Sequence, residues 1–472
     1  MEKKNQMKGA TELTHLRVLV LPFPIQGHIN PMLQFAKRLL SKGLTVTLLT
    51  PTSSAHNLIK PNPNSTSKSL HIQPIDDSFP PGTKPGVTAE YFNQFRAGIT
   101  KSLTDLIRHD ISATTTTTTT TTKPLPKFLV YDCFMTWALD VARESGIDAA
   151  PFFTQSCAVN AVYNDFKEAE VKGGDEGVSL PWKGLLSWND LPSLVHETTV
   201  YGVLREFLMD QYYNVGEAKC VLANSFDELE NQVMNWMPSQ WRIKNIGPTV
   251  PSMFLDKRLE DDKDYGLTLF KPQAVTCLTW LDSKQPSSVI YVSFGSLASL
   301  SGEQMTELAR GLQMSCDHFL WVVRDLEKLK LPESFKEETS DKGLVVSWSP
   351  QLEVLAHKSM GCFMTHCGWN STLEALSLGV PMVAMPQWTD QPTNAKFITD
   401  VWQVGIRVEV NEEGIVTREE ISKCINEIME GEKGKDIKKN SEKWRDLAIA
   451  AMNEGGSSDK NIGEFIALLA SN

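Results

Sequence analysis

Residues 16–50 read LRVLVLPFPIQGHINPMLQFAKRLLSKGLTVTLLT, and this stretch decides the fold. Residues 16–22 are apolar and rich in strand formers, which predicts a first strand. The segment NPMLQFAKRLLSKG predicts a helix, with Asn30 as the N-cap, Pro31 in the first helical position and Gly43 as the C-cap. TVTLLT predicts a second strand. A strand, a helix and a strand in this order imply a parallel sheet with a right-handed crossover.

The next strand of this predicted sheet is separated from the first two by a low-complexity tract. KFLVYD predicts a strand that ends at Asp132, and WALDVARESG after it predicts a helix. Nine consecutive threonines, residues 114–122, precede this strand. Polar low-complexity sequence cannot bury a core, so the tract predicts a surface loop.

The second half of the chain shows the same alternation. Five short apolar runs predict strands: SVIYVSFG, HFLWVV, GLVVSW, GCFMTH and PMVAMPQ. Gaps long enough for helices separate most of them, which predicts a second doubly wound parallel sheet. The polar stretch before them carries the charge run RLEDDKDYG and is the best candidate linker. We therefore predict an N-terminal domain over residues 1–247, a linker over 248–275 and a C-terminal domain over 276–453.

Composition excludes several classes of protein. A chain of 472 residues exceeds one ordinary core, and 41% hydrophobic with 22% charged residues is typical of a globular protein. A formal charge of -11 argues against a nucleic-acid or anionic-membrane partner. The sequence shows neither a signal peptide nor an apolar run of membrane-spanning length. Eight cysteines without a CxxC pattern favour a reducing compartment, so we expect a cytoplasmic protein. We also expect it to be a monomer.

Ligands of open parallel sheets bind beyond the carboxyl ends of the strands, and this rule selects candidate residues. In the first half, His28 follows the first strand and Asp132 ends another. Both side chains would lie at one edge of the sheet. A histidine oriented by a carboxylate is a competent general base. The alternative is an unrelated loop histidine and strand-end carboxylate, and a nucleophilic triad is disfavoured because no GxSxG motif accompanies the pair.

Four strand ends in the second half carry polar or aromatic residues. They are SFGS with Ser293 and Gly295, WSPQ with Trp348, Ser349 and Gln351, the stretch THCGWNSTLEA over residues 365–375, and Asp390 with Gln391. Together they offer a stacking surface, phosphate donors at a helix start and partners for hydroxyls. A nucleotide that carries a sugar requires all three.

The stretch THCGWNSTLEA permits two interpretations. Asn370 or Ser371 can cap a helix, and Ser371 with Glu374 matches a capping box. The same helix start is also a site for an anion, and Gly368 would let a phosphate approach the backbone. Capping alone leaves His366 and Trp369 unexplained, so the ligand interpretation is favoured.

The sequence argues against a metal site and a dinucleotide site. Cys362, His366 and Cys367 match no usual zinc spacing, and Asp262 with Asp264 form a DxD within a solvated charge run. Neither first strand is followed by GxGxxG, which counts against an NAD-linked oxidoreductase. We therefore expect no metal.

Residues 348–391, from W-x-P-Q through H-x-G-W-N-S and the following glutamate to the closing D-Q, resemble the signature box of plant family 1 UDP-glycosyltransferases. GHINP, YDCFMTWALDVA and FGS extend the resemblance across the chain. It is closest to the subgroup that glucosylates carboxylates and steroid or phenolic hydroxyls. The resemblance implies a GT-B fold, with two Rossmann-like domains facing a cleft. It also implies that residues 454–472 form a helix that packs back on the N-terminal domain.

The resemblance further implies a role for each candidate residue. The acceptor would bind to the N-terminal domain, and UDP-glucose would bind to the C-terminal domain as a co-substrate, without a cofactor. Trp348 would stack on uracil, Ser349 and Gln351 would contact the base and ribose, and Glu374 would bind the ribose hydroxyls. The remaining donor contacts implied are Gly27, Thr154, Ser293, Gly295, His366, Gly368, Trp369, Asn370, Ser371, Asp390 and Gln391.

The reaction implied is inverting transfer of glucose to a hydroxyl, with His28 as the base and Asp132 holding its imidazole. We expect a small apolar plant metabolite, a steroid, phenolic or flavonoid, as acceptor. Proximity to motif residues names Ile25, Met135, Gln155 and Trp388 as acceptor contacts. Two alternatives remain open: glucose-ester formation on an aromatic carboxylic acid, and a nucleotide-sugar-binding protein without turnover.

Overall fold

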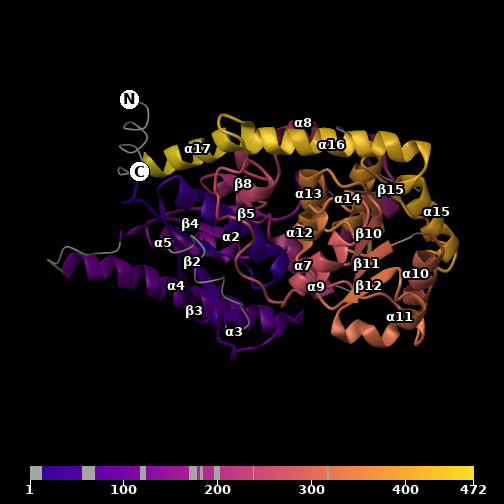
Figure 1. Ribbon diagram of the computed structural model, residues 1–472. Coiled ribbons are helices and arrows are strands. Elements are labelled where there is room, and N and C mark those ends of the chain that lie inside the picture. The colour runs from indigo at the N-terminus through magenta and orange to yellow at the C-terminus, as the bar shows by residue number, and fades with distance from the viewer. Residues whose placement is uncertain are drawn as a thin grey trace. The chain divides into compact units, whose positions relative to one another are not determined.

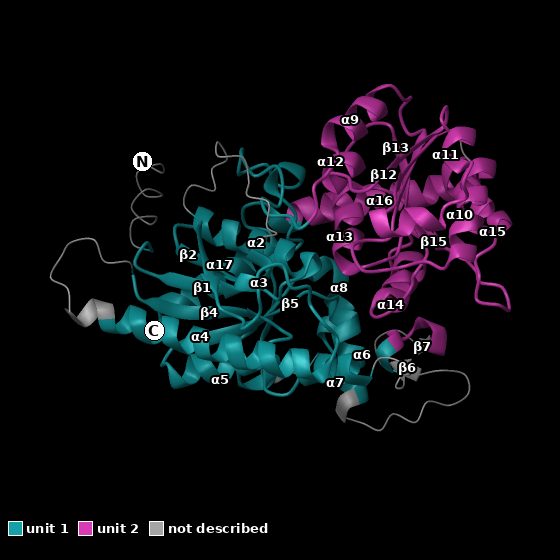
Figure 2. Cartoon of the chain, turned by 90° about the horizontal axis from the view of Figure 1, so that it is seen from below, with its two compact units in different colours: residues 1–171, 194–269, 451–472 teal, residues 172–193, 270–450 magenta. Residues whose placement is uncertain are grey.

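A computed structural model describes residues 13–55, 70–116, 124–168, 178–180, 184–195, 202–237, 239–315 and 318–471. Two compact units make up the chain (Figure 2). Unit 1 contains residues 1–171, 194–269 and 451–472, and unit 2 contains residues 172–193 and 270–450. Each unit is built on its own parallel sheet, and we describe each separately.

The sheet of unit 1 has seven strands in the order β3-β2-β1-β4-β5-β8-β9 within the described residues. All neighbouring pairs are parallel. The strands are β1 (Arg17–Leu21), β2 (Thr45–Pro51), β3 (His71–Ile75), β4 (Pro126–Asp132), β5 (Asp148–Phe153), β8 (Val221–Ala223) and β9 (Ile243–Asn245). The predicted strand–helix–strand unit and the predicted strand that ends at Asp132 are confirmed.

Helix α2 (Gln26–Ser41) begins five residues before Pro31, the predicted first helical position. Ile25 is the N-cap residue, and its carbonyl accepts the amides of His28 and Ile29. The prediction of Asn30 as N-cap with Pro31 in the first position was therefore wrong, because Pro31 lies inside the helix. A proline in the second turn removes only one backbone donor, and buried side chains along the helix hold it against the sheet. The early start places His28 in the first turn.

The end of helix α2 also differs by one residue from the prediction. Lys42 is the C-cap residue, and Gly43 follows it with a φ of 93°, a conformation that favours glycine. The other helices of unit 1 are α3 (Thr52–Ala55), α4 (Ala89–Thr116), α5 (Trp137–Glu144), α6 (Cys157–Glu168), α7 (Gly202–Asp210), α8 (Asp227–Met234) and α17 (Ser457–Ala470). Helix α4 extends to Thr116, so the predicted threonine loop begins as helix, and residues 117–122 lie outside the described part.

The core of unit 1 forms where α2 and α17 cover the sheet (Figure 1). Phe35 of α2 and Phe465 of α17 lie with their ring centroids 5.8 Å apart, and Phe128 of β4 meets Phe465 edge to face. Aromatic residues of this size bury large areas and dominate the stability of a core. The final helix of the chain is thus part of the core of unit 1.

The sheet of unit 2 has six parallel strands in the order β12-β11-β10-β13-β14-β15 in the described residues. The strands are β10 (Val289–Ser293), β11 (His318–Val322), β12 (Gly343–Val346), β13 (Met360–Thr365), β14 (Met382–Ala384) and β15 (Gly405–Arg407). The first five match the five predicted runs. This doubly wound order confirms the predicted fold class.

Helices cover the sheet of unit 2. They are α9 (Ala274–Asp282), α10 (Gly302–Ser315), α11 (Phe335–Glu338), α12 (Gln351–Leu355), α13 (Trp369–Leu378), α14 (Gln391–Lys396), α15 (Arg418–Met429) and α16 (Glu432–Met452). A core of buried aliphatic and aromatic side chains, among them Trp321 and Phe335, joins α10 and α15 to the strands. No helix in the described residues is long and apolar enough to cross a membrane.

The two units do not divide the chain as simply as the predicted domains. The predicted linker, residues 248–275, is split, with 248–269 in unit 1 and the remainder in unit 2. Residues 172–193, which come from the predicted N-terminal domain, group with unit 2. The last 22 residues, which include α17, group with unit 1. The assignment of acceptor and donor to separate domains stays a prediction.

Candidate functional site

Unit 1 brings His28 and Asp132 into direct contact. Strands β1 and β4 are parallel neighbours, so the start of α2 and the end of β4 meet at one edge of the sheet. The Nδ1 atom of His28 lies 2.6 Å from Oδ2 of Asp132. The carboxylate is fully buried, whereas the imidazole keeps 11% of its side-chain surface exposed. One nitrogen is thus held inside the protein while part of the ring remains open to solvent.

The surroundings of this pair fix its orientation. Oδ1 of Asp132 accepts the backbone amide of Phe134 at 3.1 Å, and the ring of Phe134 lies 4.7 Å from the imidazole. Oγ1 of Thr154 lies 3.4 Å from the same Nδ1. A carboxylate that accepts Nδ1–H selects the tautomer whose Nε2 can accept a proton. This geometry suits a general base, and the role of His28 as that base stays a prediction.

The predicted acceptor residues of unit 1 lie near this pair in the chain. Ile25 is the N-cap of α2, and Met135 is fully buried, with its amide bonded to the Asp132 carbonyl. Gln155 is also buried, and its Oε1 has no hydrogen-bond partner among the described residues. Such a group indicates a place where a ligand or water completes the bonding. Gly27 is the second residue of α2.

An aromatic cluster beside His28 was not predicted. The ring centroid of Phe23 lies 6.0 Å from that of the imidazole. The ring centroid of Phe207, in α7, lies 5.8 Å from that of Phe23 and 5.5 Å from that of Phe134. Phe207 also stacks on Phe92 at 4.0 Å. These rings come from four separate parts of the chain, so no local pattern in the sequence could have brought them together.

In unit 2, Gln351 is partly buried and is the centre of a polar network. Its Nε2 donates to Oγ of Ser371 at 3.0 Å and to Oε2 of Glu374 at 2.5 Å. Its Oε1 accepts the hydroxyl of Tyr291 at 3.0 Å, and the same hydroxyl lies 2.8 Å from Oγ of Ser349. Four predicted residues therefore form one hydrogen-bonded group.

This network corrects the capping-box interpretation. Helix α13 begins at Trp369 with Gly368 as the N-cap residue, and the cap makes no side-chain hydrogen bond. Ser371 and Glu374 lie inside the helix, so neither side chain caps it. Their bonds to Gln351 instead align a hydroxyl and a carboxylate at the carboxyl edge of the sheet. Asn370 is the second residue of this helix.

The start of α13 encloses His366 between two glycines. A Cβ atom on Gly368 would lie 2.5 Å from Nε2 of His366, and one on Gly295 would lie 2.7 Å from it. Gly295 also has a φ of 71°, where a side chain would be strained. Burial, together with the positive charge of Arg324, lowers the pKa of His366 to about 4. The imidazole is therefore neutral at pH 7, beside the N-terminus of helix α13 and Ser293 at the end of β10.

Trp348 follows β12 and stacks on Phe270, with ring centroids 4.2 Å apart and an interplanar angle of 22°. The amide of Gln273 bonds to the carbonyl of Trp348 at 3.0 Å, which fixes the backbone that carries the indole. The indole is partly buried. The stacking contact with Phe270 fixes the orientation of the indole ring.

The loop between β14 and α14 holds Trp388, Asp390 and Gln391 together. Oε1 of Gln391 accepts the amides of Gln387 and Trp388 at 2.9 and 3.1 Å. Oδ2 of Asp390 accepts Nδ2 of Asn394 at 2.8 Å, and both predicted residues are buried. Trp369 is buried against Trp402, at 6.0 Å. These bonds hold the carboxylate of Asp390 and the amide of Gln391 in fixed positions in the loop.

The alternative chemistries find no support in these positions. Asp262 is paired with Lys37 at 2.9 Å and accepts the amide of Ser252 at 2.7 Å, so its carboxylate links two segments of unit 1. Burial raises the pKa of Cys367 far above its ordinary value, which keeps it a thiol. No group of three or more His, Cys, Asp or Glu residues that could hold a metal occurs in the described residues.

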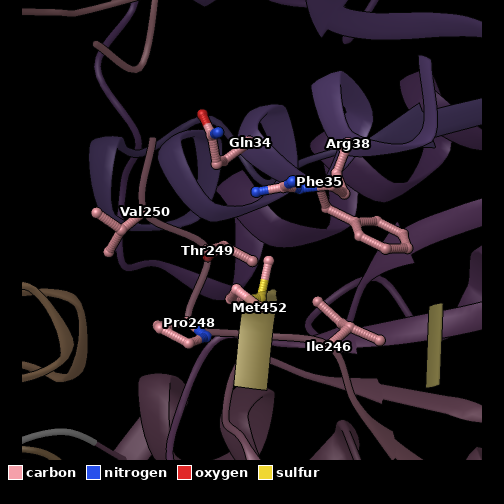
Figure 3. Close-up of a pocket in the computed structure, with 8 residues that line it drawn as sticks. All are labelled: Gln34, Phe35, Arg38, Ile246, Pro248, Thr249, Val250 and Met452. Atoms are coloured by element: carbon pink, nitrogen blue, oxygen red, sulfur yellow. The ribbon is translucent and has the colours of Figure 1, made fainter. Parts of the chain in front are cut away.

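Sequence reasoning missed Tyr291, Phe270 and Arg324 because each lies outside the strand-end motifs. Tyr291 sits in the middle of an apolar strand, where it reads as a core residue. Its one distinguishing signal is a hydroxyl in a fully buried run, since a buried hydroxyl needs a partner. A small pocket in unit 1 is lined by Gln34, Phe35, Arg38, Ile246, Pro248, Thr249, Val250 and Met452 (Figure 3). None of the predicted site residues lines it.

Comparison with known proteins agrees with the geometry. Residues 221–450 match the family described as UDP-glucoronosyl and UDP-glucosyl transferase. UDP-glycosyltransferase 74D1 of Arabidopsis thaliana is 51% identical over 97% of this chain and 99% of its own length. Mogroside I-E synthase of Siraitia grosvenorii is 48% identical over 96% of this chain and 98% of its own.

Solved structures of related proteins have the same fold as this chain. Os79 from O. sativa in complex with UDP has a TM-score of 0.87 and 37% identity, over 96% of this chain and 100% of that one. Phytolacca americana UGT2, complexed with UDP-2fluoro-glucose and pterostilbene, has a TM-score of 0.79 and 29% identity over 96% and 99%. The chain therefore belongs to the plant family 1 UDP-glycosyltransferases, enzymes that use a UDP-sugar as co-substrate, and has their GT-B fold.

Proposed function

We propose that this enzyme is an inverting, UDP-glucose-dependent O-glucosyltransferase that acts on a hydroxyl of a small apolar plant metabolite. The observation that carries this proposal is the 2.6 Å contact between Nδ1 of His28 and the buried Asp132 carboxylate. An alcohol needs its proton removed as it attacks, and an oriented imidazole with a free Nε2 provides that base.

The donor is assigned to unit 2. Trp348 stacks on the uracil, and Gln351 and Glu374 meet the ribose through the network that includes Ser349. The diphosphate lies at the start of α13, where amide N–H groups and the helix dipole favour an anion. His366, Ser293, Asn370 and Ser371 complete that cradle, and Gly295 and Gly368 leave the room it needs. Trp369, Asp390 and Gln391 bind the glucose, with Gly27 and Thr154 as lesser donor contacts from unit 1.

The chemical step follows from these roles. His28 takes the proton of the acceptor hydroxyl on Nε2, and Asp132 stabilises the imidazolium that forms. The acceptor oxygen forms a bond to the anomeric carbon as the bond from that carbon to the UDP oxygen breaks. UDP leaves with the electron pair, and the α-linked donor gives a β-glucoside. The amides of α13 and a neutral N–H of His366 stabilise the charge that develops on the diphosphate.

The aromatic cluster of Phe23, Phe92, Phe134 and Phe207 supports an apolar acceptor, because rings beside the base favour a flat or polycyclic surface. The relatives fit this chemistry. One is named a mogroside synthase, and solved neighbours hold a trichothecene or pterostilbene. We propose a steroid, phenolic or flavonoid hydroxyl compound as the acceptor class, and Ile25, Met135, Gln155 and Trp388 as further acceptor contacts.

The test is product formation by the purified chain with UDP-glucose. Acceptors are triterpenoid and steroid alcohols, flavonoids, stilbenes and aromatic carboxylic acids, with detection by mass spectrometry and mild alkali to separate glucosides from esters. We expect alkali-stable β-glucosides of hydroxyl compounds. If only esters form, the enzyme is a glucose-ester-forming transferase and the proposal is wrong. If no glucosylated product forms, the alternative of a nucleotide-sugar-binding protein without turnover is favoured. UDP-galactose and UDP-glucuronate in parallel assays test the choice of glucose.

A further inference from the structure

A short segment from the first half of the chain is built into unit 2. Residues 187–193 lie between α6 and α7 in the sequence, and both of these helices belong to unit 1. The segment contains the 3-10 turn Trp188–Asp190, which is closed by a capping box between Ser187 and Asp190. Its polar contacts reach the β14–α14 loop, α14 and β15, the elements that carry the sugar end of the proposed donor site.

Asp190 is the centre of these contacts. Its Oδ1 accepts Nη1 of Arg407 at 2.7 Å, and its Oδ2 lies 3.7 Å from the ammonium of Lys396. Oδ2 also accepts the hydroxyl of Ser187 at 2.6 Å. Arg407 makes a second bond, from Nη2 to the carbonyl of Asn189, at 2.9 Å. The Asp190 carboxylate is 9% exposed, and a pair so buried is costly to break by removing one partner.

Ser193 makes hydrogen bonds to both the carbonyl and the amide of Thr389. Its amide donates to the Thr389 carbonyl at 2.9 Å, and its Oγ accepts the Thr389 amide at 2.7 Å. Thr389 has a φ of 56°, which is unfavourable for a β-branched residue and persists only where the surroundings enforce it. Oγ1 of Thr393, in α14, donates to the carbonyl of Asp190 at 2.7 Å. The loop and the helix after it are therefore tied to one segment.

Thr389 stands directly between Trp388 and Asp390, and Gln391 follows. We infer that Asp190 is a positioning residue for the donor sugar: segment 187–193 fixes the loop that presents Asp390 and Gln391 to glucose. This inference rests on the proposed function, because it concerns how one half of that donor site is held. The nucleotide half is built from β10, α12 and α13, so the loss of Asp190 weakens binding of UDP-glucose but not of UDP.

The experiment is calorimetric titration of the full chain with UDP and with UDP-glucose, in the absence of any acceptor. Asp190→Asn removes the charge at nearly constant shape, and Arg407→Gln removes its cation. We expect both variants to bind UDP-glucose about tenfold more weakly and UDP within about twofold of the wild type, a tenfold change being ~1.4 kcal/mol. The ratio of the affinity for UDP-glucose to that for UDP-galactose decreases in both variants. Arg407→Lys keeps the positive charge and retains part of the affinity for UDP-glucose that Arg407→Gln loses.

Arg310→Gln is the matched control, because it also removes an arginine of unit 2 from an ion pair, here with Glu338 on the surface. It should change neither affinity. Ser193→Ala keeps the backbone bond and serves as a milder variant if Asp190→Asn unfolds. Equal weakening of UDP and UDP-glucose, or no weakening of either, overturns the inference alone. A wild-type chain that binds UDP but not UDP-glucose overturns the proposed donor, and the inference with it.

Discussion

At the residue scale, the proposed reaction depends on Nε2 of His28, because Nδ1 is held by Asp132. We expect His28→Ala to lower kcat for a hydroxyl acceptor by about 10²- to 10⁴-fold, the usual contribution of a general base. Asp132→Asn should also lose activity, since an amide no longer selects the tautomer. The measurement is initial rate with UDP-glucose, with UDP affinity as the control. A His28→Ala enzyme of wild-type rate on an alcohol would refute the assignment.

A second residue-scale prediction concerns the pH dependence of stability. The pKa of His366 is about 4 in the folded protein and ~6.5 in an unfolded chain, so between these values only the unfolded state binds the proton. The free energy of unfolding is therefore unaffected by this histidine above pH ~6.5. It decreases as the pH falls from ~6.5 towards 4, by at most ~1.4 kcal/mol per pH unit. His366→Gln lacks this loss. Between pH 7.5 and pH 5, the melting temperature of the wild type should therefore fall more than that of the variant. An equal fall in both proteins would contradict this prediction.

At the element scale, the start of α13 needs a glycine because of His366. A Cβ on Gly368 would lie 2.5 Å from the imidazole, whereas one on Gly302, at the start of α10, meets nothing within 4 Å. We expect Gly368→Ala to displace the ring, cost ~1–3 kcal/mol of stability and weaken UDP binding about tenfold. Gly302→Ala should change neither. Calorimetry and thermal unfolding check both, and equal behaviour of the two variants would show that the enclosure of His366 is unimportant.

The elements also show how far the sequence predicts this molecule. The contact of His28 with Asp132 follows from a rule about strand ends, since both flank adjacent parallel strands. The start of α2 does not follow, because Asn30 and Pro31 imitate a helix start inside a helix whose first turn is held by Ile25. Strand β15 was missed because Gly405–Arg407 is too short to give a periodic signal. The role of segment 187–193 depends on contacts more than 190 positions away, which no local pattern encodes.

At the scale of the whole molecule, the last helix is joined to unit 1 by a chain of charges. Asp459 pairs with Lys42 at 2.6 Å and with Arg258 at 2.9 Å. Arg258 also donates to the carbonyl of Met452, which lines the pocket that also includes Arg38 (Figure 3). This arrangement fixes the point where the chain returns to unit 1, so helix α17 is held by polar contacts at its start and by aromatic packing along its length.

Burial alone would raise the pKa of Asp459, but the bonds from Lys42, the Gly455 amide and Arg258 lower it to about 2. A lowered carboxyl pKa gives stability that is present above the unfolded value, ~3.9, and is lost as the pH falls through 2. Asp459→Asn should therefore cost ~2 kcal/mol at pH 7 and less at pH 3, where the unfolded carboxyl is largely protonated. Glu464→Gln, on the same helix, breaks an exposed pair with Lys244 and should cost less than ~1 kcal/mol. Thermal unfolding at both pH values measures this, and equal losses for the two variants would mean that the charges around Asp459 add nothing beyond the packing of α17.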